Sequence, residues 1–170
     1  MNESGFLFLH FSSIDEKRIQ AIRAFTHELI TKTMNTLNVS HEIAFLLLDH
    51  LHWNQEELNS KWASSQNELL KAVHIKLGGT VVPNLESHLS AIECGTGTCP
   101  ACSRERRLME LYCGHKICND CLIEEIKNAL SENRIPTCRE DECKAEILST
   151  DVEKLLPHSK NAKVYKSWRL

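Results

Sequence analysis

The sequence predicts two small parts: a bundle of α-helices, followed by an α+β module that zinc stabilises. The cysteines support this division, because all 8 lie between Cys94 and Cys143 while residues 1–93 contain none. Apolar residues recur at three- and four-residue intervals up to Leu77, which is the spacing of amphipathic helices. A length of 170 residues suits one ordinary domain or two small ones, so each part has room for only a modest core.

Composition excludes several classes of protein. Hydrophobic residues make up 42% and charged residues 25% of the chain, with 6 Gly and 4 Pro, so we expect folded structure rather than disorder. The 20 Lys and Arg against 23 Asp and Glu leave a net charge of -3. This balance does not favour electrostatic binding to nucleic acid or to anionic lipid, and we expect neither as a partner.

The first residues do not resemble an export signal. The lead is acidic, and the apolar run Phe6–Leu9 is shorter than the ~7–15 residues of a signal core. No stretch reaches the ~18 continuous apolar residues of a membrane span. We therefore expect an intracellular protein, cytoplasmic or nuclear or both, without a membrane partner. In those compartments cysteines stay reduced and paired cysteines commonly hold zinc.

Residues 1–38 predict one long amphipathic helix. Ser13 and Glu16 have the spacing of a capping box, in which each side chain satisfies an orphan amide of the first turn. The segment Asn38-Val-Ser40 interrupts the pattern and is expected to end the helix. The apolar face carries Ile19, Ile22, Phe25, Leu29, Ile30 and Leu37.

Residues 39–79 predict a bundle of three short helices. The first, capped by Ser40, is apolar nearly all round and is therefore expected to be buried. Asn54 and Glu57 have capping-box spacing at the start of the second. Gly78-Gly79 are expected to end the third.

The boundaries of the remaining segments follow from where the apolar periodicity stops and where the paired cysteines begin and end. Residues 80–98 show no sustained periodicity and predict a linker. The cysteine-rich part then occupies residues 99–156, and residues 157–170 are expected to begin a further module.

The ligand types in the cysteine-rich part come in closely spaced pairs. A two-residue gap lets a tight turn aim both thiolates at one ion, and Gly114 relaxes the turn across a one-residue gap. The four pairs are Cys99 with Cys102, Cys113 with His115, Cys118 with Cys121, and Cys138 with Cys143.

Eight donors in four pairs predict two zinc ions, because zinc takes four sulfur or nitrogen ligands in a tetrahedron. Each pair supplies half a tetrahedron, so two pairs distant in the sequence must meet around each ion. The segment is too short to form a hydrophobic core of its own. We therefore expect metal binding and folding to be one process here.

Other uses of the cysteines are less favoured. Four disulfides would give His115 no role, and a thioredoxin-type motif would need a CxxC that opens a helix after a strand. Cys94 falls outside the four pairs. We interpret it as a free surface thiol, and the alternatives are a substitute ligand or a nucleophile. A nucleophile needs an activating base, for which His88 is only a distant candidate.

The ligand spacing resembles that of a RING finger. The pattern is Cys-x2-Cys-x10-Cys-x-His-x2-Cys-x2-Cys-x16-Cys-x4-Cys over Cys99–Cys143. Its final x4 gap and the following run Ile147–Val152 resemble the first RING of RING-between-RING ubiquitin ligases. Upstream, Leu46–Asn54 with Leu58 and Trp62 resembles the ubiquitin-associated-like (UBA-like) domain that precedes this RING in Ariadne-type ligases.

This resemblance implies an Ariadne-type E3 ubiquitin ligase or a fragment of one: a UBA-like helical bundle followed by a cross-brace RING-type zinc domain. In a cross-brace the ligand pairs alternate between two zinc ions. One ion would take Cys99, Cys102, Cys118 and Cys121, and the other would take Cys113, His115, Cys138 and Cys143.

The resemblance also implies partners. A shallow groove between the two zinc loops would recruit a conjugating enzyme charged with ubiquitin, and the helical bundle would dock a ubiquitin-like modifier or a cullin-type partner. The groove residues carried over by position are Pro100 and Ala101 of the first loop, Glu140 within residues 139–142 of the second, and Leu122 and Ile126 of the helix after Cys121.

No catalytic residue is expected in this chain. In the family the ubiquitin thioester forms on a cysteine of a second RING, and Leu170 lies about where the in-between domain would begin. A non-catalytic adaptor or competitor that binds conjugating enzymes or ubiquitin-like partners is therefore the alternative function. Sequence-specific DNA binding is disfavoured, since the chain lacks a CxxC…HxxxH finger with a basic reading helix.

Overall fold

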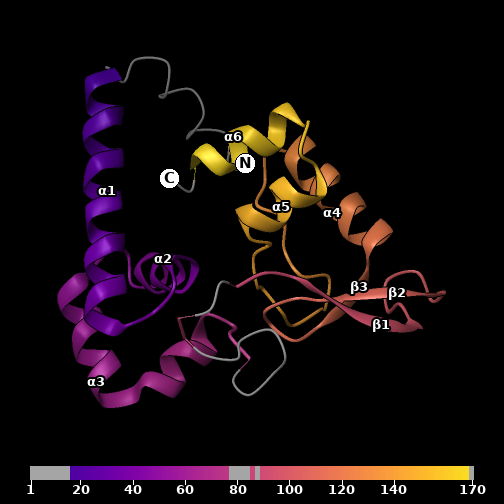
Figure 1. The fold of residues 1–170 in the computed structure, drawn as a ribbon, viewed down its shortest axis with the longest axis horizontal. Coiled ribbons are helices and arrows are strands. Elements are labelled where there is room, and N and C mark those ends of the chain that lie inside the picture. The colour runs from indigo at the N-terminus through magenta and orange to yellow at the C-terminus, as the bar shows by residue number, and fades with distance from the viewer. Residues whose placement is uncertain (1–15, 77–84, 87–88, 169–170) are drawn as a thin grey trace, which may run out of the picture.

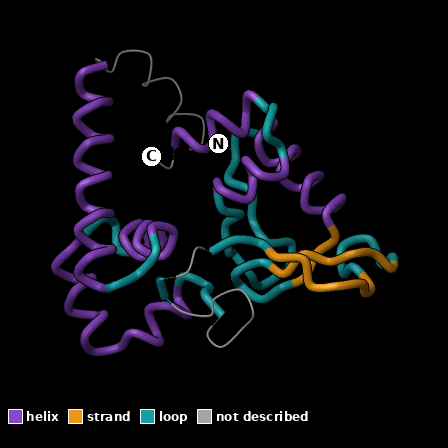
Figure 2. The backbone as a smooth tube through the Cα atoms, viewed as in Figure 1, coloured by secondary structure: helices purple, strands orange, loops and turns teal. Residues whose placement is uncertain are grey.

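The computed structural model describes residues 16–76, 85–86 and 89–168 and arranges them in two parts (Figures 1 and 2). The first part, which we call the helical unit, contains α1 (Glu16–Leu37), α2 (His41–His50) and α3 (Gln55–Ala72). The second part, residues 89–168, is the cysteine-rich module, and it combines a small sheet with three further helices. None of the helices in the described ranges has the length and apolar character needed to cross a membrane.

The break between the first two helices agrees with the sequence prediction. Asn38 follows the end of α1 with a left-handed φ of 54°, a conformation that asparagine tolerates better than most residues. Ser40 then caps α2, because its hydroxyl oxygen accepts a hydrogen bond from the Ile43 amide at 3.5 Å. The capping box predicted at Ser13 lies outside the described residues.

The two helices predicted after Asn54 are the two halves of α3. Asn54 caps this helix through a 3.1 Å hydrogen bond that its Oδ1 accepts from the Glu57 amide. Ser65 interrupts the helix with φ -152° and ψ 46°. Ser64 and Ser65 both donate hydroxyl hydrogen bonds to carbonyls one turn earlier, a competition with the backbone that bends helices. The predicted stop at Gly78-Gly79 lies outside the described residues, and α3 already ends at Ala72.

The α2 helix forms the centre of the helical unit, as its apolar sequence predicts. Ile43, Leu47 and Leu48 are fully buried, and α1 and α3 both pack against this helix. The amphipathic pattern of α1 is used only in part. Ile30 is buried, whereas Ile22 and Phe25 are each 61% exposed. Figure 1 shows the reason: α1 extends well beyond α2, so its first turns project away from the core that the described residues form.

A three-stranded antiparallel sheet organises the cysteine-rich module. Its strands, β1 (Ile92–Thr98), β2 (Glu105–Glu110) and β3 (Lys116–Cys118), lie in the order β1-β2-β3. The predicted linker over residues 80–98 is therefore wrong from Ile92 onward. Gly95 and Gly97 hide this strand from sequence reasoning, because they remove the apolar alternation and a bulge shifts the register between Glu93 and Thr96.

One helix packs against the sheet, and two further helices complete the core. α4 (Asn119–Ser131) packs against β2, β3 and α6 (Lys160–Trp168), and α5 (Ser149–Leu155) packs against α6. Tyr165 on α6 is 1% exposed, and its hydroxyl donates to the Ile147 carbonyl at 2.8 Å. Ala162 and Tyr165 on α6 are thus part of this module's core. The sequence placed them at the start of a further module because eight ligands already completed the motif.

Asp151 is a buried carboxyl in the first turn of α5. Its side chain is 3% exposed and accepts a 2.9 Å hydrogen bond from the Ala91 amide, which ties α5 to the segment entering β1. Burial raises the pKa of Asp151 from 3.8 to about 6, and the Ala91 amide only partly offsets this effect. The folded protein therefore binds more protons than the unfolded chain between about pH 4 and 6, and stability falls as pH rises through that window.

Replacing Asp151 by Asn is expected to stabilise the protein at neutral pH, because Asn keeps the acceptor for Ala91 and carries no charge to bury. The melting temperature of the zinc-loaded variant should exceed that of the original chain at pH 7.5, by the equivalent of about 1–3 kcal/mol. The advantage should shrink at pH 5.5, where the original carboxyl is largely protonated. A constant difference between the two pH values would contradict the buried-charge explanation.

Candidate metal centres

Two groups of four potential ligands form in the cysteine-rich module. Within each group the donor atoms all lie within 4.8 Å of one another. One group contains Cys99, Cys102, Cys118 and Cys121, and the other contains Cys113, His115, Cys138 and Cys143. The pairs therefore alternate along the chain between the two groups, as the RING resemblance implies.

The first group joins the β1–β2 turn to the start of α4. Cys99 follows β1, and its carbonyl accepts from the Ser103 amide at 2.8 Å, which closes a tight turn around Cys102. Cys118 ends β3 and occupies the N-cap position of α4, which places Cys121 in the first helical turn. This CxxC therefore opens a helix after a strand, contrary to the sequence expectation, and the neighbouring pair Cys99 and Cys102 is what marks it as a metal site. The Cys118 amide donates to Cys99 Sγ at 3.3 Å, so the backbone itself brings the two pairs together.

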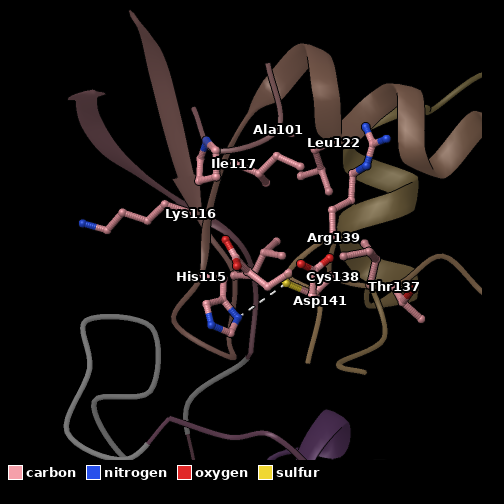
Figure 3. Close-up of a pocket in the computed structure, with 13 residues that line it drawn as sticks. Ala101, His115, Lys116, Ile117, Leu122, Thr137, Cys138, Arg139 and Asp141 are labelled. Atoms are coloured by element: carbon pink, nitrogen blue, oxygen red, sulfur yellow. Dashed lines mark hydrogen bonds between the residues drawn. The ribbon is translucent and has the colours of Figure 1, made fainter. Parts of the chain in front are cut away.

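The second group joins the β2–β3 turn to the loop between Cys138 and Cys143. Gly114 adopts a left-handed φ of 83° between Cys113 and His115, which lets both side chains of the pair face the same point. The loop closes through two backbone hydrogen bonds, from Cys138 to Ala145 at 2.7 Å and from Cys143 to Glu140 at 2.9 Å. His115 Nδ1 lies 3.5 Å from Cys138 Sγ (dashed in Figure 3).

The helical unit reaches the second group through Lys76. Its amide donates to the Tyr112 carbonyl at 3.2 Å, and its side chain crosses Gly114 so closely that a Cβ there would overlap Lys76 Cδ. Lys76 Nζ also lies 3.7 Å from the buried carboxylate of Glu110. The ligand turn is therefore packed between the sheet and the end of the helical unit.

The thiols of each group cannot all ionise without a cation. In the first group, burial alone would raise the pKa of Cys99, but hydrogen bonds from the Cys118, Cys102 and Ala101 amides outweigh burial and lower the pKa to about 6. Burial and the neighbouring thiols raise the pKa of Cys121 to about 12.

The second group divides in the same way. A hydrogen bond from Cys113 lowers the pKa of Cys138 to about 5, against the opposing effect of burial. The same hydrogen bond, together with burial, raises the pKa of Cys113. In each group one thiol ionises readily while the pKa of at least one neighbour is raised. A bound dication would stabilise all the thiolates of a group together.

The distances within both groups fit zinc. Two thiolates about 2.3 Å from a tetrahedral ion lie about 3.8 Å apart, and Cys102 Sγ lies 3.9 Å from Cys118 Sγ. A thiolate and an imidazole nitrogen on the same ion lie about 3.5 Å apart, and His115 Nδ1 lies 3.5 Å from Cys138 Sγ. The donor sets, one of four sulfurs and one of three sulfurs with one nitrogen, are those of structural zinc sites. The module therefore has places for two zinc ions.

Cys94 lies apart from both groups. It is half-buried in β1, and its Sγ contacts the Leu108 carbonyl at 3.4 Å. None of the eight cysteines forms a disulfide, which disfavours the disulfide alternative. Cys94 is free, but it is half-buried rather than at the surface as predicted.

A pocket of about 200 Å³ opens where the two zinc loops and α4 meet (Figure 3). Pro100 and Ala101 line it from the first loop, Glu140 from the second, and Leu122 from α4, so four of the five predicted groove residues border it. Ile126 does not. Its side chain is fully buried beneath the helix, which makes it a core residue rather than a contact residue.

Sequence reasoning missed several residues of this pocket. Ile117, Ile147, Lys116 and His115 also line it. Ile117 directly precedes the ligand Cys118, and Ile147 lies four residues after the ligand Cys143. Nothing in their spacing distinguishes a pocket wall from a core position.

Several curated E3 ubiquitin-protein ligases are similar in sequence to this chain. No family model matches the chain. The sequence is 30% identical over 131 residues to E3 ubiquitin-protein ligase HEL1 of Saccharomyces cerevisiae, which covers 72% of this chain and 23% of the relative. It is 29% identical over 98 residues to E3 ubiquitin-protein ligase ARIH2 of Mus musculus, and this match covers 56% of this chain and 18% of the relative. It is 30% identical over 141 residues to the probable E3 ubiquitin-protein ligase ARI3 of Arabidopsis thaliana, and this match covers 81% of this chain and 25% of the relative.

The chain is a homologue of Ariadne-type RING-between-RING E3 ubiquitin ligases. It spans a quarter or less of the length of these three relatives.

Removing one ligand of the second group should remove one ion. We expect the purified chain to carry two zinc ions in native mass spectrometry, Cys138→Ser to carry one, and the control Cys94→Ser to keep both. Chelation should release both ions and abolish the near-ultraviolet circular dichroism of Tyr112 and Tyr165, which are buried in this module. A metal-free chain with an unchanged fold would contradict the assignment.

Proposed function

We propose that the cysteine-rich module recruits a ubiquitin-charged conjugating enzyme through the pocket between its two metal loops. The observation that carries this proposal is the position of the pocket. Residues from both loops and from α4 converge on it, so one surface depends on both metal groups. The homologous ligases act in ubiquitin transfer by their names, and a conjugating enzyme is the partner that such ligases require.

The chemistry of the pocket suits an apolar side chain with polar surroundings. Ile117, Leu122 and Ile147 are almost fully buried and form its base, while Pro100 and Ala101 are exposed at its edge. Apolar area covered by a partner contributes about 25 cal/mol per Å². The polar residues around this base, Lys116, Arg139, Glu140 and Asp141, would select the orientation and identity of the partner.

A non-catalytic adaptor is the second candidate, and the state of Cys94 favours it. Seven of the eight cysteines belong to the metal groups, and Cys94 is half-buried in a strand with its sulfur against a backbone carbonyl. A thioester-forming nucleophile needs an accessible thiolate and a base. These 170 residues would then bind a charged conjugating enzyme and leave the second transfer step to a cysteine elsewhere.

The helical unit would supply a second docking surface. We assign it as a UBA-like module on the order of its three helices and on the segment Leu46–Asn54, and its partner would be a ubiquitin-like modifier or a cullin-type protein. Phe45 and Trp53 support a binding role. They form an edge-to-face pair with ring centroids 5.6 Å apart and remain half-exposed at the end of α2.

A charge placed in the pocket should abolish recruitment. We expect the zinc-loaded chain to bind a purified conjugating enzyme in isothermal titration calorimetry, and Ala101→Asp to weaken binding about tenfold or more, because the aspartate would desolvate against an apolar base. Ala63→Asp, on the exposed face of α3, is the matched control and should bind normally. Absence of binding with both zinc ions present would remove the proposal.

The same proteins distinguish the two candidates. If the chain acts as an adaptor, it should bind the charged conjugating enzyme without accelerating ubiquitin release onto free lysine. Release above the background rate, lost in Ala101→Asp, would instead assign transfer activity to the module itself.

A further inference from the structure

Glu125 is a buried carboxylate on α4 that faces two arginines. Its side chain is 9% exposed, and each of its oxygens points to a different guanidinium. Oε1 accepts a 2.6 Å hydrogen bond from Arg134 Nη1, and Oε2 lies 3.9 Å from Arg139 Nε. A buried carboxylate requires such pairing, because an unpaired charge in the interior is strongly disfavoured.

Arg134 fixes the orientation of this carboxylate. Its backbone amide donates to the Ala129 carbonyl at 2.9 Å, at the turn that ends α4, and its Nε donates to Glu132 at 2.7 Å. Arg134 is thus held at both its backbone and its side chain. With Oε1 occupied by Arg134, the second oxygen of Glu125 is left facing the second metal loop.

Arg139 belongs to that loop and lines the proposed partner pocket. It directly follows the ligand Cys138, and its side chain is 42% exposed. Figure 3 shows it extending from the loop toward the helix that carries Leu122. Its contacts with Glu124 and Glu125, at 3.8 and 3.9 Å, are ion pairs without hydrogen-bond distances, so guanidinium donors remain available to a partner.

We propose that Glu125 is a positioning residue for conjugating-enzyme binding: it holds Arg139 against α4 at the edge of the pocket, where the guanidinium donates to an oxygen acceptor on the enzyme. The inference rests on the proposed function of the pocket. It adds a determinant of partner specificity, because the buried carboxylate of Glu125 on α4 sets the orientation of the Arg139 guanidinium on the second metal loop.

Competing carboxylates make this positioning necessary. Glu140, Asp141 and Glu142 follow Arg139 on the same loop, and all three are exposed. Without an attraction toward α4, the guanidinium would turn toward these neighbours and leave the pocket edge. Glu125 prevails because Coulomb attraction is stronger at a buried site than between solvated charges. Glu124, 64% exposed, adds a weaker contact.

A double-mutant cycle with the zinc-loaded full chain tests the inference. Glu125→Gln keeps the size of the side chain and an acceptor for Arg134 but removes the charge facing Arg139. We expect it to weaken conjugating-enzyme binding about three- to fivefold in calorimetry. Arg139→Gln should weaken binding at least as much. The double variant should bind no more weakly than Arg139→Gln alone, because Glu125 acts only through Arg139.

Glu153→Gln is the matched control, since it removes an exposed carboxylate from an ion pair with Lys166 that lies outside the pocket and outside the Glu125 network. Its affinity should be unchanged. An unaltered affinity in Glu125→Gln would overturn the inference, as would an equal loss from Glu125→Gln in the Arg139→Gln background, which would mark a general structural effect. If the original chain fails to bind, the proposed function itself falls.

Zinc content and melting temperature are measured for every variant. If Glu125→Gln folds poorly, the variants of the exposed residues Arg139 and Glu124 test the proposal instead. Arg139→Gln should then weaken binding at least threefold, and Glu124→Gln should weaken it by less than twofold. Wild-type affinity in Arg139→Gln would overturn the proposal.

Discussion

Metal–ligand closure is the constraint on which the cysteine-rich module depends. Along the chain, the two pairs of donors in each group are separated by a pair that belongs to the other group. Neither group can therefore form while the segments between its own two pairs remain extended. The free thiols oppose this closure, because one thiolate raises the pKa of its neighbours. A dication reverses the sign of that interaction and converts four competing groups into four ligands. The pocket depends on the same closure, since its two walls are the metal loops.

The helical unit and the cysteine-rich module support each other at their junction. The buried apolar residues form one continuous cluster from Ile30 on α1 to Tyr165 on α6. Lys76 adds a polar tie between the two parts, because its amide donates to the Tyr112 carbonyl. The close passage of Lys76 over Gly114 places the end of the helical unit directly on a ligand turn.

The proposed recognition pocket is separate from the cysteine that lies outside the metal groups. The pocket has an apolar base with a charged edge, which suits binding, while the one cysteine outside the metal groups is held within a strand. The homologous ligases are at least four times as long as the matched part of this chain. The Glu125–Arg139 pair fits this division, because it tunes which partner binds and contributes no reactive group.

The sequence by itself determined the metal chemistry and the existence of most helices. Zinc needs particular donor atoms at short spacing, so the four pairs can be read without coordinates, and the N-caps at Ser40 and Asn54 are equally local. Tertiary structure decided β1, because a glycine-containing strand is stabilised by its partner β2 rather than by its own pattern. It decided that Ile126 is core and that Ile117 and Ile147 line the pocket, since burial is a property of neighbours. It also brought Glu125 to Arg139: their attraction depends on a distance of a few ångströms between helix and loop, and residue spacing does not contain that distance.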